Sequence, residues 1–462
     1  MERSKKKELS KGVLIYAVGT FVPRILSFLV VPLYTYYIST EDLGVYDVLM
    51  ATASLLTPII TLQISDAAYK WLLQDDHVEA HIRAAIQVLL INCGIAIVLI
   101  NLVNRFFPIA YCPLFSFVLV LSLLLGTMKK ILRGIKRQKL FAISGIIQSA
   151  VFLSLAVFQV VYLKNGIVGL FHSSIASDIL TIVFILFAEP RIRVNIFGAM
   201  NTEMIINMLK FSVPLIPNYM NWWVMNTSDK YIVNIFLGSA ANGILAVSHK
   251  FPGMLQTVLG LFNTSWQDVS VAEKQTDGNY NTILFRKLYR FALGLLLPLI
   301  PATKVFVTLV MNTDYKSSGN YIAFYYLGIV FHAFSSFYGV GYLRNNQTKR
   351  AFSTSVYGAA VNAISHICLI GILGLQAAAV STFLGGLTVW LIRERQNRNE
   401  LGILVQWNKL IIITGCAVFF AVVSILTDVR INVVLFFAGI AAFAIINIKF
   451  IGQQFGSFPR EE

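Results

Sequence analysis

Charged residues are scarce in this chain of 462 residues, because only 13% are Asp, Glu, Lys or Arg, whereas soluble domains average about 25%. Hydrophobic residues make up 57%, and the mean hydropathy is +0.71. This composition excludes a soluble globular protein. No segment between the apolar runs approaches the ~100 residues of a nucleotide-binding domain, and no Walker A motif is present, so ATP is not expected to be the direct energy source.

Cysteine is also scarce. The four cysteines are Cys93, Cys112, Cys368 and Cys416, which lie far apart in or near apolar runs without a C-x-x-C pattern. Neither a disulfide framework nor a metal site is predicted, and no cofactor is expected. The basic N-terminus precedes an apolar run of about 26 residues that carries Pro23 and Arg24 and lacks an A-x-A cleavage site, which is typical of a retained first helix.

The apolar runs predict an all-α polytopic membrane protein with about fourteen transmembrane helices, since one span and its loop take about 30 residues. The predicted spans are 12–37, 43–64, 84–103, 108–128, 141–163, 166–188, 211–236, 241–265, 287–311, 320–342, 351–372, 375–393, 409–427 and 431–451.

Basic residues predict the orientation of these spans. With the N-terminus inside, the inner segments collect 29 Lys and Arg residues and the outer segments collect 4. Cytoplasmic loops carry such an excess, so both termini are expected in the cytoplasm. The net charge of +15 has the same cause, and no nucleic-acid partner is predicted.

Two pairs of segments indicate an internal repeat. GIVGLFHSSIAS at 166–177 matches GILGLQAAAVST at 371–382, and ISTEDLGVYDV at 38–48 lies opposite LGSAANGILAV at 237–247. The offsets of 205 and 199 residues correspond to six helices, an even number, so the predicted repeat is parallel, as in transporters that rock two lobes around a midplane site. We therefore expect an N-lobe at 1–195, a C-lobe at 196–395 and two additional spans with a tail at 396–462.

Polar residues recur at helical spacing in several spans. Tyr16, Thr20 and Arg24 share a face of the first span, and Tyr219, Trp223, Asn226 and Lys230 share a face of the seventh, with Asp229 beside them. A charge near the bilayer centre costs at least about 2.5–3.5 kcal/mol and so faces a cavity or a partner. Helix packing remains the alternative for polar stripes, ion pairing for Lys230 and Lys250, and snorkelling to the interface for Lys304.

The residues also resemble a known family. LSKGVLIYAVGTFVPRILSFLVVPLYTYYISTEDLGVYDVL and WWVMNTSDKYIVNIFLGSAANGILAVSHKFPGML are similar to segments of the polysaccharide-biosynthesis branch of the multidrug/oligosaccharidyl-lipid/polysaccharide (MOP) exporter superfamily. SWQDVSVAEK and the stretch that includes VNAISHICLIGIL also resemble it, and the resemblance covers most of residues 9–395. Two residues depart from the pattern, because Lys230 stands where Arg is common and Leu245 where Tyr is common.

The resemblance implies a flippase, not an enzyme, that moves an undecaprenyl-diphosphate-linked oligosaccharide across the bacterial cytoplasmic membrane for surface polysaccharide biosynthesis, such as O-antigen or capsule. Polysaccharide polymerase and glycosyltransferases are candidate partners. The predicted cations for the diphosphate are Arg24, Lys230, Lys250 and Lys304, and the predicted groups for the sugars are Tyr16, Thr20, Tyr219, Trp223 and Asn226. Asp178 and Asp229 are the candidates for ion coupling.

The alternative function is an ion-coupled multidrug exporter of the same superfamily. Exporters of cationic drugs need acidic residues in the cavity of the first lobe, and the first span offers Arg24 instead. A membrane-embedded glycosyltransferase or polymerase needs an acid or base in a sizeable loop, and the predicted outer loops are too short to build one.

Overall fold

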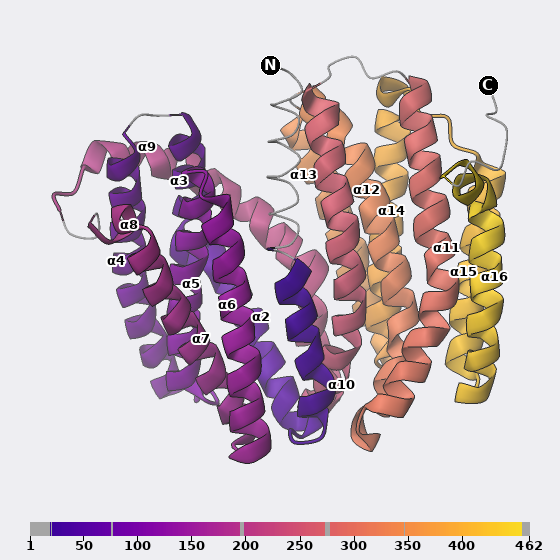
Figure 1. Cartoon of the computed structure of the whole chain (residues 1–462), viewed down its shortest axis with the longest axis horizontal. Coiled ribbons are helices and arrows are strands. Elements are labelled where there is room, and N and C mark those ends of the chain that lie inside the picture. The colour runs from indigo at the N-terminus through magenta and orange to yellow at the C-terminus, as the bar shows by residue number, and fades with distance from the viewer. Residues whose placement is uncertain are drawn as a thin grey trace. The chain divides into compact units, whose positions relative to one another are not determined.

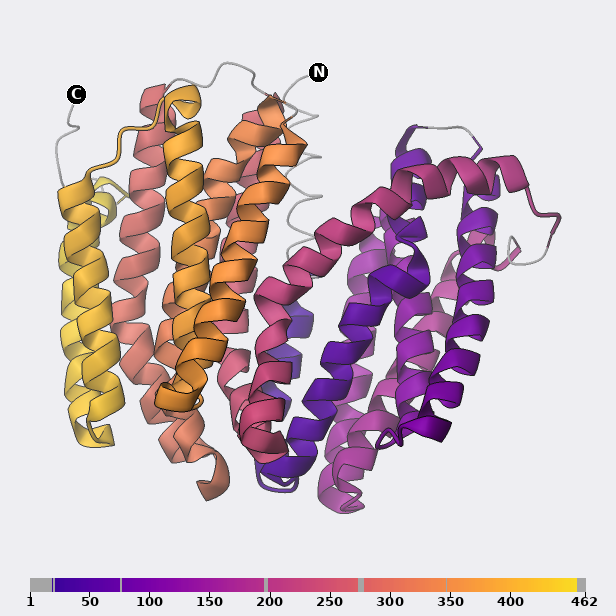
Figure 2. The same cartoon turned by 180° about the vertical axis from the view of Figure 1, so that it is seen from behind.

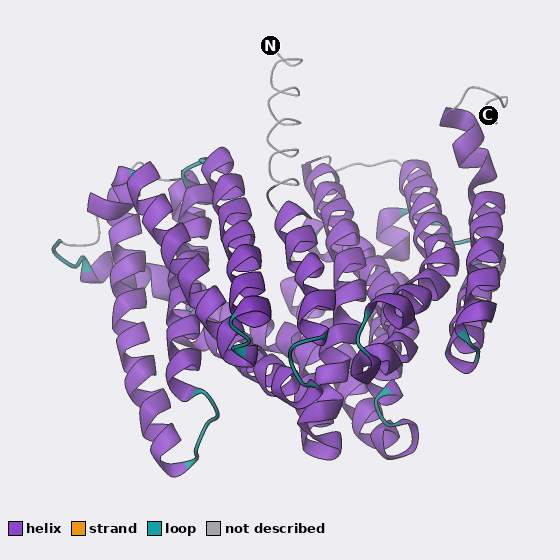
Figure 3. Cartoon of the chain, turned by 60° about the horizontal axis from the view of Figure 1, so that its bottom comes forward, coloured by secondary structure: helices purple, strands orange, loops and turns teal. Residues whose placement is uncertain are grey.

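The computed structural model describes Gly19 and residues 21–74, 77–194, 198–272, 278–345 and 347–454. Within these ranges the regular elements are helices and no strand occurs (Figure 3). By length and composition, 11 helical segments of the described chain can cross a membrane. The predicted class, an all-α polytopic membrane protein, is confirmed.

Each predicted span coincides with a helix in the described part of the chain. The described part of the first predicted span contains the shorter apolar helix Phe21–Thr35, and residues 12–18 and 20 of that span lie outside the described residues. The twelfth coincides with α14 (Gln376–Leu401), and neither helix is among the 11 candidates. The candidate Thr202–Gln267 has 66 residues, which at about 1.5 Å per residue far exceeds the ~30 Å of a bilayer core. It contains the predicted spans 211–236 and 241–265, and Gly238 interrupts it with φ 85° and ψ 173°, a backbone conformation that glycine adopts without steric cost.

Contacts divide the chain into two compact units, Met1–Trp223 and Val224–Glu462. The first unit contains the helix Phe21–Thr35 and the start of α10. Between them lie α2 (Thr40–Thr61), α3 (Ile64–Gln74), α4 (Val78–Phe106), α5 (Cys112–Gly134), α6 (Gln138–Ala156), the π-helix η1 (Val157–Tyr162), α7 (Gly166–Ala188), α8 (Pro190–Val194), α9 (Thr202–Ser212) and the 3₁₀ helix η2 (Val213–Leu215).

The core of the first unit forms around α5, which contacts α3, α4, α6 and α7 (Figure 1). Fully buried aliphatic residues such as Ile64, Ala68, Ile82 and Ile131 pack there. Local signals define the helix ends: Ser39 caps α2 by accepting a hydrogen bond from the backbone N–H of Asp42 at 3.1 Å. The short amphipathic helices α3 and α9, which contact each other, overlap the predicted spans only at residues 64 and 211–212.

The second unit contains most of α10 (Ile216–Ala272). The described residues after it form six α-helices and one 3₁₀ helix, in the order α11 (Gly278–Val310), the 3₁₀ helix η3 (Thr313–Tyr321), α12 (Ile322–Arg344), α13 (Thr348–Leu373), α14, α15 (Trp407–Leu426) and α16 (Val429–Gln454). Helix α12 is the most buried, and α14 packs along it (Figure 2). Glycines permit this close approach, because a Cβ added at Gly386 would lie 2.9 Å from the carbonyl oxygen of Gly328.

Large apolar side chains remain exposed along the spans of both units. The exposed fraction is 67% for Val98, 74% for Phe187 and 78% for Leu426. Soluble monomers rarely expose such extensive apolar surface, whereas lipid solvates it. The exposed surface therefore agrees with a multi-pass membrane protein.

Candidate functional site

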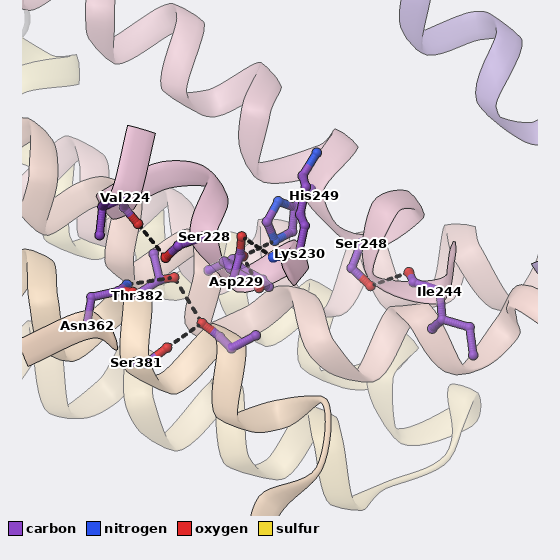
Figure 4. A network of polar contacts seen from close by, with 12 residues as sticks. Val224, Ser228, Asp229, Lys230, Ile244, Ser248, His249, Asn362, Ser381 and Thr382 are labelled. Atoms are coloured by element: carbon purple, nitrogen blue, oxygen red, sulfur yellow. Dashed lines mark hydrogen bonds and ion pairs between the residues drawn. The ribbon is translucent and has the colours of Figure 1, made fainter. Parts of the chain in front are cut away.

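A carboxylate with two partners lies in the second unit (Figure 4). Asp229 on α10 is 5% exposed, and its Oδ2 accepts a hydrogen bond of 2.9 Å from the hydroxyl of Tyr325 on α12. The same oxygen lies 3.0 Å from Nε2 of His249, farther along α10, and the His249 ring meets the Tyr325 ring edge to face with centroids 4.1 Å apart. Buried carboxylates are stable only when such partners surround them.

The surroundings of Asp229 are polar. The backbone N–H of Lys230 donates to Asp229 Oδ1 at 2.9 Å. On α13 and α14, Asn362 Nδ2 lies 3.4 Å from Thr382 Oγ1. His366 is fully buried, and neither of its ring nitrogens has a hydrogen-bond partner among the described residues. The second unit thus holds a carboxylate, two imidazoles and several hydroxyl and amide groups inside apolar helices.

The residues of the seventh and eighth spans that were predicted to bind the cargo differ in solvent exposure. Lys230 is half-buried, whereas Asn226 and Lys250 are exposed. The helical spacing of the seventh span predicted Asp229 beside Lys230. In the structure, His249 and Tyr325 also contact Asp229.

A hydrogen-bonded chain of three side chains occupies the interior of the first unit. Asp178 on α7 is 4% exposed and accepts a hydrogen bond of 2.6 Å from Nε2 of Gln148 on α6. Oε1 of Gln148 in turn accepts from the ammonium of Lys129 on α5 at 2.5 Å. The amide therefore links an acid to a base across three helices, and the charge of Asp178 is balanced without direct contact with Lys129.

An ion pair of the first unit contacts a residue predicted to bind sugars. Lys130 Nζ lies 2.6 Å from Oδ1 of Asp66 on α3, and Asp66 Oδ2 accepts a hydrogen bond of 2.8 Å from the hydroxyl of Tyr219. The ammonium of Lys130 also lies 5.9 Å from the centroid of the Tyr219 ring. Tyr219 remains 39% exposed, so its ring is available to a ligand while its hydroxyl is fixed.

Trp223 makes a comparable contact with α2. Its indole Nε1 donates to the carbonyl oxygen of Ala51 and to Oγ of Ser54, each at 3.0 Å. Two donor contacts hold the indole in one orientation. Tyr219 and Trp223 thus both connect the beginning of α10 to polar groups of the first unit.

The remaining predicted residues lie in two further places. Arg24 is exposed in the helix Phe21–Thr35. Tyr16 and Thr20 lie outside the described residues. Lys304 on α11 is 8% exposed, and its ammonium contacts the carbonyl oxygens of Ser424, Ile425 and Thr427 at 2.5, 3.2 and 3.0 Å. It thereby neutralises the negative C-terminal end of α15.

Several residues of these clusters escape the sequence analysis. Tyr325 lies among other aromatic residues, and nothing in the local pattern distinguishes it. Gln148 is a polar amide inside the predicted span 141–163, and its residue type was the available signal. Lys129 and Lys130 resemble loop residues because they open the basic segment 129–139, yet α5 extends to Gly134 and carries both. The predicted span 108–128 ends one residue before Lys129, so only the structure places both lysines on a helix. No group of three or more His, Cys, Asp or Glu residues that fits a metal ion occurs in the described ranges.

Comparison with solved structures shows the fold. A lipid II flippase, MurJ, in an inward closed conformation superposes with a TM-score of 0.68 at 14% identity, covering 96% of this chain and 100% of that chain. An inward-facing multidrug resistance MATE family transporter of the MOP superfamily has a TM-score of 0.63 at 12% identity, covering 84% and 98%. An outward-facing MATE family transporter has a TM-score of 0.58 at 11% identity, covering 85% and 95%. No curated protein matches this chain.

These neighbours are transporters and flippases, and at 11–14% identity the likeness shows that this chain shares their fold. The predicted resemblance to the polysaccharide-biosynthesis branch is confirmed by a family model. The family model described as polysaccharide biosynthesis protein matches residues 9–269, which is more than half of the 462 residues. The polar clusters above therefore lie within the fold of a membrane flippase or transporter, and the chain belongs to the polysaccharide biosynthesis protein family.

Proposed function

We propose that this protein flips an undecaprenyl-diphosphate-linked oligosaccharide across the bacterial cytoplasmic membrane for surface polysaccharide biosynthesis. The observation that carries the proposal is the family match over residues 9–269. Polysaccharide biosynthesis needs a lipid-linked glycan on the outer side of the membrane, and a polytopic protein of this family with a flippase fold supplies the crossing step.

The extent of the structural match supports a flippase over a drug exporter. The match to the lipid II flippase leaves 4% of 462 residues uncovered, about 18 residues, which is fewer than α15 and α16 contain. Most of these two helices must therefore have a counterpart in that protein. The matches to the MATE transporters leave 15–16% of the chain uncovered.

Transport in this proposal follows alternating access. The predicted parallel repeat provides two lobes, N-lobe 1–195 and C-lobe 196–395, with both termini in the cytoplasm. A midplane site must be closed to one side at a time, since simultaneous opening would make a leak. We assign the coupling ion to Asp178 or Asp229. Each is a buried carboxylate, and its neighbouring polar groups can stabilise its negative charge when no ion is bound.

The cargo contacts follow from charge and residue type. A diphosphate must exchange its hydration shell for fixed donors, and a guanidinium binds phosphate oxygens in a bidentate manner. We assign Arg24 first, then Lys230 and Lys250, to the diphosphate. Tyr219, Trp223 and Asn226, together with Tyr16 and Thr20, are assigned to the sugars. We leave Lys304 out of this site, because its ammonium is occupied by the carbonyl groups of α15.

A cation-coupled drug exporter is the second candidate function. The observation that favours it is Asp178, a buried acid in the first unit, which is the residue type that the sequence analysis requires for cationic drugs. Gln148 donates a hydrogen bond to this carboxylate, and Lys129 in turn donates to Gln148, which leaves the carboxylate less available to a cationic drug.

The test is complementation of surface polysaccharide in a strain that lacks its flippase, with membrane abundance measured in parallel. Arg24→Ala is expected to abolish complementation at normal abundance, and Arg24→Lys to retain part of it because the charge survives. The matched control Arg395→Ala, at an exposed cation of α14 outside the proposed site, should complement fully. Full activity of the triple variant Arg24→Ala, Lys230→Ala, Lys250→Ala would contradict the anionic-cargo proposal.

A further inference from the structure

A cavity of about 270 Å³ lies in the second unit among α11, α15 and α16, which contact one another (Figure 1). Its lining consists of two cations, Arg290 and Lys409, and five isoleucines. The cavity includes none of the residues assigned to the cargo.

Helix α11 packs closely on α16 about one turn from the cavity. A Cβ added at Gly294, four residues after Arg290, would lie 3.2 Å from Cδ2 of Phe443 and from Nδ2 of Asn447. The Asn447 amide donates to the carbonyl oxygen of Phe443 at 3.0 Å. The wall beside the cations is therefore formed by tightly packed helices whose amide donor is already satisfied.

No described residue provides a counter-charge for the cations of this cavity. Its described lining includes no carboxylate, and neither Arg290 nor Lys409 makes an ion pair or hydrogen bond with any described residue. Lys409 lies in the first turn of α15, which carries no acidic residue and no side-chain cap. A positive helix end beside two cations attracts an anion.

The rest of the lining is aliphatic and continues onto the exposed surface. Ile412, Ile445 and Ile448 are 64%, 71% and 55% exposed, while Ile413 is 7% exposed. Isoleucine offers no hydrogen-bonding group, so this surface suits a hydrocarbon chain and not a sugar. The volume lies just below the ~300–1,000 Å³ of small-molecule pockets, which fits a phosphate group and the start of one chain while the remainder follows the exposed isoleucines.

We propose that this cavity binds an anionic glycerophospholipid of the surrounding leaflet, with its phosphate on Arg290 and Lys409 and an acyl chain along the isoleucines of α15 and α16. The bound lipid would join α11 to the two C-terminal helices at the end of the bundle where α15 begins. In the predicted orientation this end faces the cytoplasm. The proposal concerns a resident lipid and does not depend on the identity of the transported cargo.

The experiment measures lipid binding to the purified full-length protein by native mass spectrometry. Delipidated protein is titrated with phosphatidylglycerol, which is anionic, and with phosphatidylcholine of the same acyl chains, which is zwitterionic. The wild-type protein should retain one phosphatidylglycerol molecule preferentially. Each cation near an anionic lipid contributes about 1 kcal/mol, so the double variant Arg290→Gln, Lys409→Gln should bind phosphatidylglycerol about 30-fold more weakly, which corresponds to about 2 kcal/mol.

The matched control is Lys349→Gln, Arg395→Gln, which removes two exposed cations from α13 and α14 that do not line the cavity. This control should keep the wild-type affinity. If the double variant at the cavity does not fold, Lys409→Glu replaces it, because this side chain is exposed and its substitution leaves the packed wall intact. Equal affinity for the two lipids, or unchanged phosphatidylglycerol affinity in the cavity variant, would overturn the proposal.

Discussion

The hydroxyl of Tyr325 provides the sharpest test of the buried cluster around Asp229. Tyr325 and Tyr326 are adjacent on α12, 3% and 2% exposed, and each hydroxyl makes a hydrogen bond of 2.9 Å. Their partners differ, because Tyr325 donates to the carboxylate of Asp229 whereas Tyr326 pairs with the neutral hydroxyl of Thr303. Replacing each by Phe removes one hydroxyl and keeps the ring.

The expected magnitudes follow from these partners. Hydrogen bonds between membrane helices contribute about 0.6 kcal/mol on average and at most about 1.7 kcal/mol, and bonds to charged groups are the stronger ones. Tyr325→Phe should therefore lower the free energy of unfolding by about 1.5 kcal/mol, more than tenfold in the equilibrium constant, and Tyr326→Phe by about 0.6 kcal/mol. Tyr325→Phe should also impair complementation, whereas Tyr326→Phe should not.

The assay combines each Phe variant with Asp229→Asn in a double-mutant cycle. The free energy of unfolding of every variant is measured by reversible unfolding in mixed micelles. The cost of Tyr325→Phe should largely disappear in the Asp229→Asn background, because the charged acceptor is then absent, while the cost of Tyr326→Phe should stay the same. Additive effects for Tyr325 and Asp229 would show that the hydrogen bond contributes no coupling energy. Equal effects of the two Phe variants on complementation would refute a special role of the Asp229 cluster.

Three further predictions address other parts of the molecule. Lys304→Met keeps the length of the side chain but removes the ammonium from three carbonyl oxygens, so the unfolding midpoint should fall, whereas a midpoint equal to wild type would contradict the anchoring role. Asp178→Asn should abolish transport if the coupling ion acts there, and wild-type transport by this variant would exclude the site. Gln148→Glu places a second acid beside Asp178 and should therefore lower membrane abundance. A single cysteine introduced at Lys164, in an otherwise cysteine-free protein, should react with an impermeant reagent added from outside. If that cysteine is protected and single cysteines placed within 394–408 react instead, the predicted orientation is reversed.

The sequence by itself determined the class of the molecule and the place of its helices. Long apolar runs need lipid and must satisfy their backbone groups internally, so each run becomes a helix wherever it lies in the fold. That is why the predicted spans and the described helices coincide even at 211–236 and 241–265, where a single long segment, interrupted at Gly238, contains two of them. The characteristic segments around residues 9–269 likewise pointed to the family that the comparisons identify.

Only the tertiary structure decided which polar side chains meet. Asp229 and Tyr325 are 96 residues apart, and Lys130 and Asp66 are 64 apart, so their pairing depends on how helices rotate and pack and not on local spacing. For the same reason, the sequence could not distinguish Lys304 from the other basic residues in apolar runs. Helical periodicity places a cation on a face, but the neighbouring helix decides whether that face meets a cavity or, as for Lys304, the last carbonyl groups of α15.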